Sequence, residues 1–222
     1  MTQTVHVKIC GVTSATAVED AVNAGARYLG FNFYRPSPRY VAPSKACNLM
    51  LSVPAGVAKV ALLVDPDDAE LDTLMAQVSA DFLQLHGHET PERVAEIRAR
   101  YGLPVIKAVG VANKSDLETL DRFAGVSDQL LVDAKPPRNA SLPGGNGLAF
   151  DWRLLQGRQW SRPWLLAGGL TPENVALAIE LTGARQVDVS SGVESAPGEK
   201  KRALMDAFVV AARHPKLAKV TS

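Results

Sequence analysis

Eight short apolar runs recur along the 222-residue chain at nearly even spacing. Most start 22 to 24 residues after the previous one, and two longer intervals of 30 and 35 residues leave room for loop insertions. The runs start near Val5, Tyr28, Ala58, Phe82, Val105, Gln129, Trp164 and Gln186. Because segments with helical periodicity lie between them, the pattern predicts eight strand–helix units and an α/β fold of the single-domain (β/α)8 TIM-barrel type. A doubly wound open sheet is the alternative, which spacing alone does not exclude.

The segments between the runs carry recognisable helix signals. Residues 68–75 place their apolar side chains on one helical face. Thr90 precedes Pro91, which is a favourable N-cap followed by proline at the first helical position. Thr171 and Pro172 repeat this arrangement, so we expect a second helix capped in the same way.

The length and uniform composition predict one domain over residues 1–222, because barrels of this kind need roughly 200–250 residues. Hydrophobic residues make up 46% of the chain, which allows a large core. We expect residues 213–222, which end in a mildly basic segment, to form a frayed tail.

Charge and hydropathy exclude several classes of partner. The net charge of +1 gives no general attraction to nucleic acid or to an acidic membrane. No uninterrupted apolar stretch approaches about 18 residues, so we expect no membrane span. The first residues lack the pattern of a signal peptide, and two cysteines do not make a disulfide framework. We therefore expect a cytoplasmic protein with both thiols reduced.

Strand alternation sorts the side chains into two faces. In several runs one face is purely apolar and the other is mixed, and we expect the mixed face to point into the barrel. The mixed sets are His6, Lys8 and Cys10; Gln84 and His86; Leu131 and Asp133; and Asp188 and Ser190. Because the first and last strands are neighbours in a closed barrel, we expect Lys8 and Asp188 to pair inside it, since an unpaired buried charge is strongly unfavourable.

Two reactive side chains stand at strand ends far apart in the sequence. Cys10 ends the first run and Asp133 ends the sixth. All strand ends of a parallel barrel open onto one face, so a thiol and a carboxylate there can transfer protons around one small substrate. Each residue alone has an ordinary explanation, as a small buried side chain or a loop cap. Their joint placement favours an acid–base pair.

Glycine-rich turns follow the last two strands. Gly168 and Gly169 end the seventh, and Ser190, Ser191 and Gly192 follow the eighth. Glycine lets backbone N–H groups approach an anion closely, and these two loops are the usual phosphate site of such barrels. Tight turns without a ligand are the alternative. Because no P-loop or dinucleotide fingerprint is present, we expect a phosphorylated small molecule and no nucleotide.

Arg39 lies in a proline-rich loop after the second strand, on the same predicted face. A guanidinium there is suited to binding a carboxylate through two hydrogen bonds. A solvated arginine on a rigid surface loop is the alternative.

The remaining candidates favour no metal and no cofactor. No two histidines and a carboxylate converge by spacing, so we expect His86 to be structural or to contact substrate. Lys107 is expected to point inward and join a charge network rather than form a Schiff base. Cys47 is expected in the core, beside Leu49 and Met50.

Six segments together resemble the phosphoribosylanthranilate isomerase family of tryptophan biosynthesis and cover nearly the whole chain. They are Lys8-Ile9-Cys10-Gly11, Ser37-Pro38-Arg39, Gln84-Leu85-His86-Gly87, Gly144-Gly145-Asn146-Gly147 with Phe150-Asp151-Trp152, Ala167-Gly168-Gly169-Leu170, and Val187-Asp188-Val189-Ser190-Ser191-Gly192-Val193-Glu194. Two positions depart from the family pattern: Asn146, where a small hydroxyl residue is usual, and Asn32, where an apolar residue is usual.

The resemblance implies a (β/α)8 barrel that performs an Amadori rearrangement without a cofactor. The substrate would be N-(5-phosphoribosyl)anthranilate and the product 1-(2-carboxyphenylamino)-1-deoxyribulose 5-phosphate. By motif position, Cys10 would be the general base and Asp133 the general acid. Arg39 would bind the anthranilate carboxylate, and the backbone near Gly169, Ser191 and Gly192 would bind the phosphate.

Two rival interpretations remain from sequence. The first is another sugar-phosphate barrel enzyme, but no metal-ligand set or catalytic lysine–glutamate pair stands out. The second is a barrel that binds a phosphorylated metabolite without catalysis, but Cys10 and Asp133 are both present. The chain is expected to act as a monomer or a homodimer, and the sequence does not choose between them.

Overall fold

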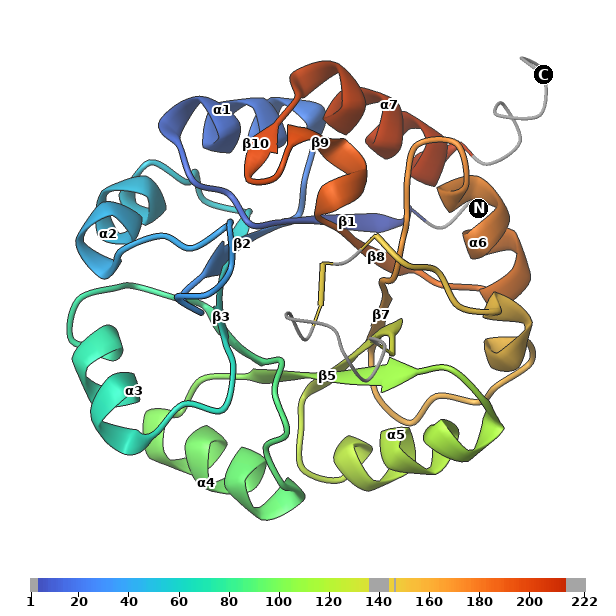
Figure 1. The fold of residues 1–222 in the computed structure, drawn as a ribbon, viewed down its shortest axis with the longest axis horizontal. Helices are drawn as coiled ribbons and strands as arrows, with labels where there is room; N and C mark the ends of the chain where they lie inside the picture. Colours follow the sequence, from blue (N-terminus) through green and yellow to red (C-terminus); the bar gives the residue numbers. More distant parts are fainter. Residues whose placement is uncertain (1–3, 136–143, 146, 215–222) are drawn as a thin grey trace.

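The chain folds into a closed barrel of eight parallel strands surrounded by helices (Figure 1). The computed structural model describes residues 4–135, 144–145 and 147–214. Each strand pairs with the next along the chain, and β8 closes the ring against β1. The strands are β1 His6–Cys10, β2 Tyr28–Asn32, β3 Ala58–Leu63, β4 Phe82–Leu85, β5 Val105–Val111, β6 Gln129–Ala134, β7 Trp164–Leu166 and β8 Gln186–Val189. The (β/α)8 prediction is confirmed, and the open-sheet alternative is wrong.

Helices cover the outside of the barrel. They are α1 Ala15–Ala24, α2 Pro43–Leu51, α3 Asp68–Met75, α4 Pro91–Tyr101, α5 Leu117–Ala124, α6 Val175–Thr182 and α7 Arg202–Arg213. The 3-10 turns are η1 Lys114–Asp116, η2 Trp152–Leu155 and η3 Ser191–Val193. After β8 and η3, a short antiparallel hairpin of β9 Glu194–Ala196 and β10 Glu199–Lys200 lies beside α1 and α7 (Figure 1).

The core has two parts, as strand alternation predicts. One face of each strand packs against the helices in a large apolar cluster. The opposite faces form a smaller cluster inside the barrel, composed of Tyr28, Val60, Ile106, Ala108, Leu131, Leu165 and Ala167. The inner cluster fills the barrel, so the polar residues above it meet a closed floor rather than a channel.

One of the two predicted caps is present. The Thr90 side chain accepts a hydrogen bond from the Arg93 N–H and begins α4 as expected. The prediction of a second such helix at Thr171 is wrong, because α6 begins only at Val175. The Asn174 side chain instead accepts from the Thr171 N–H and donates to the Gly169 carbonyl, 2.8 Å in each case. This turn therefore ties the chain to the glycine loop after β7.

The connection between β6 and β7 departs from the expected strand–helix repeat. Its described residues contain only the 3-10 turn η2 where a full helix was predicted. Gly144, Gly145, Gly147 and Gly157 lie in this stretch, and glycine is a poor helix former, which accounts for the difference.

A buried ion pair joins the two strands that close the barrel. The Lys8 ammonium donates to Asp188 Oδ1 at 2.8 Å, and the two residues are direct partners in the β1–β8 register. The Lys8 side chain is fully buried and that of Asp188 is 9% exposed. The predicted pairing is confirmed.

The prediction that Lys107 points into the barrel is wrong. Its neighbours Ile106 and Ala108 occupy the inner cluster, so alternation places Lys107 on the outer face. There its ammonium donates to Glu89 Oε2 at 2.7 Å and to the Gly87 carbonyl at 2.8 Å. The expected charge network exists, but it lies on the outer side of the barrel strands.

The chain end differs slightly from expectation. Arg213, the first residue of the predicted tail, is the last residue of α7, and its guanidinium donates to the Gly25 carbonyl. Residues 215–222 lie outside the described part of the chain. Among the residues described, no helix is long and apolar enough to cross a membrane.

The ion pair predicts a measurable loss of stability. Lys8→Met leaves the Asp188 carboxylate buried without its partner, and we expect it to lower the free energy of unfolding by about 3–5 kcal/mol. The double variant Lys8→Met/Asp188→Leu should recover part of that loss. Urea denaturation followed by circular dichroism tests both expectations. Wild-type stability in the single variant, or no recovery in the double variant, would contradict the account.

Candidate active site

One pocket opens at the carboxyl ends of the strands and gathers most of the predicted site residues. Its lining includes Cys10, Arg39, His86, Asp133, Gly168, Gly169, Ser190 and Ser191. Gly192 is not part of this lining, although it follows Ser191 directly in η3. Residues from β1, β6 and the loops after β2, β4, β7 and β8 thus meet as the barrel geometry predicts.

Cys10 ends β1 and is 6% exposed. Gly30 on the neighbouring strand leaves room for its sulfur, because a Cβ at that position would come within 2.8 Å of Sγ. Burial raises the pKa of the Cys10 thiol above its ordinary value. Asp188 adds to this increase, whereas Lys8 and Lys200 oppose it. In the substrate-free protein the thiol is therefore harder to ionise than a free cysteine.

Lys8 remains charged beneath Cys10. Burial lowers the pKa of Lys8, but Asp188 and the ionised form of Cys10 raise it, and the net shift is upward. Since Lys8 stays protonated, it supplies a fixed positive charge that favours the thiolate.

Asp133 is held by two neighbours near the end of β6. Its Oδ1 accepts a hydrogen bond from the Ala134 N–H at 2.8 Å. Its Oδ2 lies 3.3 Å from Nε2 of His86, which follows β4. Glycine is needed beside it, because a Cβ at Gly144 would lie 2.9 Å from Oδ2 and one at Gly168 3.3 Å from Oδ1. The carboxyl group therefore has a fixed position with one oxygen directed toward His86.

A hydrogen bond on its far side orients His86. The Gln84 amide nitrogen lies 2.9 Å from His86 Nδ1. This contact fixes the orientation of the ring, with Nε2 directed toward Asp133. His86 thus contacts the proposed acid directly, which the sequence analysis had left undecided between a structural and a substrate-contacting role.

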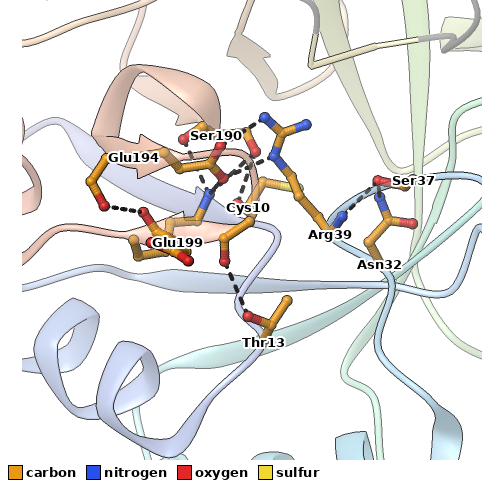
Figure 2. Close-up of polar contacts among 11 residues, drawn as sticks. Cys10, Thr13, Asn32, Ser37, Arg39, Ser190, Glu194 and Glu199 are labelled. Carbon is orange, nitrogen blue, oxygen red and sulfur yellow. Dashed lines mark hydrogen bonds and ion pairs between the residues drawn. The ribbon is translucent and has the colours of Figure 1, made fainter.

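Arg39 reaches the pocket already paired. Its guanidinium donates to both carboxylate oxygens of Glu194, at 2.9 and 2.8 Å, as Figure 2 shows. Its Nη1 end faces Gly145, where a Cβ would come within 2.8 Å. Arg39 is buried, so it is not the solvated surface residue of the alternative interpretation. Its two hydrogen bonds to Glu194 hold the guanidinium group in a fixed plane.

Asn32 shapes the loop that carries Arg39. Its side-chain amide donates to Ser37 Oγ at 3.0 Å, and the same Oγ accepts from the Arg39 N–H at 3.1 Å (Figure 2). Its Oδ1 accepts from the Tyr34 N–H. The unusual polar residue at position 32 is thus satisfied by the loop. Asn146, the other departure, lies outside the described residues.

The glycine loops after β7 and β8 adopt conformations that require glycine. Gly168 and Gly169 have φ values of 85° and 62°, in the left-handed region. A Cβ at Gly169 would also meet the backbone of Leu148 and Ala149. The Ser190 hydroxyl donates to the Cys10 carbonyl at 3.1 Å. This hydrogen bond joins the loop after β8, where the phosphate is predicted to bind, to the end of β1 that carries the thiol.

Lys200 and Glu194 are charged residues of the site that the sequence analysis did not single out. Lys200 donates to Glu194 Oε1 at 2.6 Å, and its side chain is fully buried. Burial raises the pKa of Glu194, but Arg39 and Lys200 lower it by more than burial raises it. The net shift is downward, and Glu194 stays ionised. Lys200 stands in the β9–β10 hairpin, outside the barrel strands, so strand periodicity gave no signal for it.

Glu89 is a second buried charge that the sequence analysis did not identify. Its carboxylate accepts from the N–H groups of Asp65 and Gly87 and from Lys107. These bonds fix the loop after β4, which carries His86.

Cys47 lies at an intermediate level of exposure in α2 rather than in the core, and it is a free thiol like Cys10. Among the described residues, no group of three or more His, Cys, Asp or Glu side chains is placed to hold a metal ion.

Comparison with known proteins gives a consistent result. A family model described as N-(5'phosphoribosyl)anthranilate (PRA) isomerase matches residues 7–211. The N-(5'-phosphoribosyl)anthranilate isomerase of Paracoccus denitrificans is 62% identical over 211 residues, which cover 95% of this chain and 98% of that protein. The crystal structure of phosphoribosyl anthranilate isomerase from Thermotoga maritima superposes with a TM-score of 0.85 at 36% identity, covering 94% and 98% of the two chains.

A second solved structure contains a ligand. It is phosphoribosyl anthranilate isomerase in complex with reduced 1-(o-carboxyphenylamino)-1-deoxyribulose 5-phosphate, with a TM-score of 0.82 and 35% identity. The match covers 94% of this chain and 98% of that one.

The environment of Cys10 predicts its reactivity toward alkylation. Because only the thiolate reacts and burial raises the thiol pKa, the rate should reach half its maximum at a higher pH than for a free thiol. The measurement is the rate of iodoacetamide modification against pH in a Cys47→Ser background, with glutathione as reference. A midpoint at or below that of glutathione would contradict this prediction.

Proposed function

The chain belongs to the N-(5'-phosphoribosyl)anthranilate isomerase family, and we propose that Cys10 and Asp133 are the general base and general acid of that reaction in it. The enzyme converts N-(5-phosphoribosyl)anthranilate to 1-(2-carboxyphenylamino)-1-deoxyribulose 5-phosphate, the third step of tryptophan biosynthesis from chorismate. One observation carries the proposed roles: a thiol and a carboxyl group, 123 positions apart in sequence, line the same pocket at the ends of β1 and β6.

The first step opens the sugar ring. Asp133, in its protonated form, donates a proton to the furanose ring oxygen. The bond between C1 and that oxygen breaks, and the anthranilate nitrogen lone pair forms a C=N bond, which gives an iminium. His86 Nε2, 3.3 Å from Asp133 Oδ2, is placed to donate a hydrogen bond to the carboxylate that Asp133 becomes, and such a bond stabilises the charged form.

The second step removes a proton from C2 of the sugar. The Cys10 thiolate takes this proton, and the C–H electrons form a C1=C2 bond as the iminium nitrogen regains its lone pair. The resulting enolamine tautomerises to the ketone, with a proton added at C1 and one lost from the C2 hydroxyl. Proton transfer alone balances the reaction, so no cofactor is required.

The two anionic groups of the substrate fit opposite sides of the pocket. Arg39, held in plane by Glu194, is suited to the anthranilate carboxylate. The backbone near Gly169, Ser191 and Gly192 is suited to the phosphate, because glycine lets backbone N–H groups approach an anion closely, and Gly168 and Gly169 adopt left-handed conformations there. Asn174 supports this assignment by anchoring the Gly169 carbonyl.

A single-domain, cytoplasmic enzyme that acts as a monomer or homodimer also belongs to this proposal. The continuous barrel of the described residues supports one domain. The two free thiols, Cys10 and Cys47, support a reducing compartment. Analytical ultracentrifugation of the purified protein would decide between monomer and dimer.

The activity is tested by the fluorescence decay of phosphoribosylanthranilate generated in place, with and without the protein. Protein-dependent decay to the rearranged ribulose phosphate, identified by mass spectrometry, is the expected result. Decay at the spontaneous rate with demonstrably folded protein would instead support a barrel that binds a phosphorylated metabolite without catalysis.

Removal of either proposed proton-transfer group should lower turnover while leaving the fold intact. We expect Cys10→Ala and Asp133→Asn each to reduce kcat by about 10²–10⁴ or more, the usual scale of acid–base catalysis. The measurement is steady-state kinetics on variants whose circular dichroism matches the wild type. Near-normal turnover in either variant would exclude the role given to that residue.

Arg39 should act mainly in binding. We expect Arg39→Ala chiefly to raise KM, because it removes the partner of the substrate carboxylate. Arg35→Ala, in the same loop but with its guanidinium over the Tyr40 ring, is the matched control and should change KM little. An unchanged KM in the Arg39 variant would reject the carboxylate contact.

A further inference from the structure

We propose that Lys200 is a positioning residue for the general base, whose buried ammonium stabilises the Cys10 thiolate. The proposal rests on the proposed function, since it concerns the same proton-transfer group. It assigns a role in the reaction to the short β9–β10 hairpin, which lies outside the strands and helices of the barrel.

The contacts of Lys200 place its charge beside the strand end that carries Cys10. Its ammonium donates to the carbonyl and hydroxyl oxygens of Ser190, at 3.1 and 3.3 Å. The Ser190 hydroxyl in turn donates to the Cys10 carbonyl at 3.1 Å. Figure 2 shows this path from the hairpin to Ser190 and Cys10. One hydroxyl therefore bridges the ammonium and the backbone of the proposed base.

Lys200 is not buried simply to satisfy Glu194. That carboxylate already receives two hydrogen bonds from Arg39, at 2.9 and 2.8 Å, and accepts a third from Lys200 at 2.6 Å. One carboxylate thus serves two cations. A buried ammonium that shares its counter-ion is costly, so a further anion in the cluster would offset that cost.

The charges around Cys10 come from five segments. Lys8 on β1 pairs with Asp188 on β8, and Lys200 on β10 shares Glu194 on β9 with Arg39 from the loop after β2. In their ionised forms, three cations face two carboxylates. The cluster therefore carries one excess positive charge while Cys10 is a thiol, and ionisation of Cys10 neutralises it.

Burial dominates the pKa of both groups: it leaves the pKa of the Cys10 thiol above its ordinary value and that of Lys200 below its ordinary value, and the two groups oppose these shifts in each other. Burial lowers the pKa of Lys200, while Glu194 and the ionised form of Cys10 raise it and Arg39 lowers it. Conversely, Lys200 lowers the pKa of Cys10 against the effect of burial. The two groups thus stabilise each other's charged form. Lys8, which is paired with Asp188, also lowers the pKa of Cys10, so Lys200 adds to the positive charge that Lys8 already supplies.

A purely structural role would be to hold the hairpin against β8 through Ser190. It would change the stability or the amount of active enzyme, but not the pH at which Cys10 ionises. The test must therefore read the titration of the thiol itself.

The experiment measures iodoacetamide modification of Cys10 against pH in full-length protein with Cys47→Ser. Lys200→Met should move the midpoint up by about one pH unit and slow modification at neutral pH about tenfold. Lys200→Gln, which keeps a polar group at the position, should give the same shift, and Lys200→Arg, which keeps the charge, should leave the midpoint near that of the parent. Lys201→Met changes the exposed neighbouring lysine and is the matched control, with no shift expected.

An unchanged midpoint in a folded Met or Gln variant would overturn the proposal. Loss of the fold in both neutral variants, with a normal Arg variant, would also overturn it in favour of a structural role. The ascending limb of kcat/KM against pH should move with the alkylation midpoint. If the midpoint moves and that limb does not, the effect of Lys200 on Cys10 stands, and the assignment of Cys10 as the base fails instead.

Discussion

The ion pair between Lys8 and Asp188 is the interaction on which the active face is built. It joins the two strands that close the barrel, with an N–O distance of 2.8 Å between side chains that are almost fully buried. Because a buried charge is tolerated only when it is paired, the pair fixes the register of β1 against β8. That register sets the positions of Cys10 and Ser190, which lie two residues further along the same strands.

The charged groups above this pair follow a consistent arrangement. The base lies among cations, with Lys8 below and Lys200 beside it, whereas the acid lies beside the imidazole of His86. Glycine takes the positions where a side chain would collide with either group, at Gly30 beside Cys10 and at Gly144 beside Asp133. The barrel thus places the proposed base and the proposed acid in different environments within one pocket.

Strand alternation and chain closure were enough to predict the barrel, the inward direction of Cys10 and Asp133, and the buried pair of Lys8. Contacts made by the loops and by the β9–β10 hairpin were not predictable in this way. Periodicity carries no information on the pairing of Arg39 with Glu194, 155 residues away, or on the hairpin that delivers Lys200. The prediction of a helix capped by Thr171 was wrong because the Asn174 side chain binds the glycine loop after β7. The prediction for Lys107 was wrong because its neighbours Ile106 and Ala108 fill the interior, which places Lys107 on the outer face of β5.

The central claim is that a base removes the proton from C2 and that the enolamine takes a new proton at C1. The most direct test is the mass of the product formed in D2O, after exchangeable positions are returned to hydrogen and with preformed product as control. The account predicts deuterium at C1 of the ribulose phosphate, because the thiol and the enolamine equilibrate with solvent. A product without deuterium at C1 would contradict it, since the proton taken from C2 would then reach C1 without exchanging with solvent.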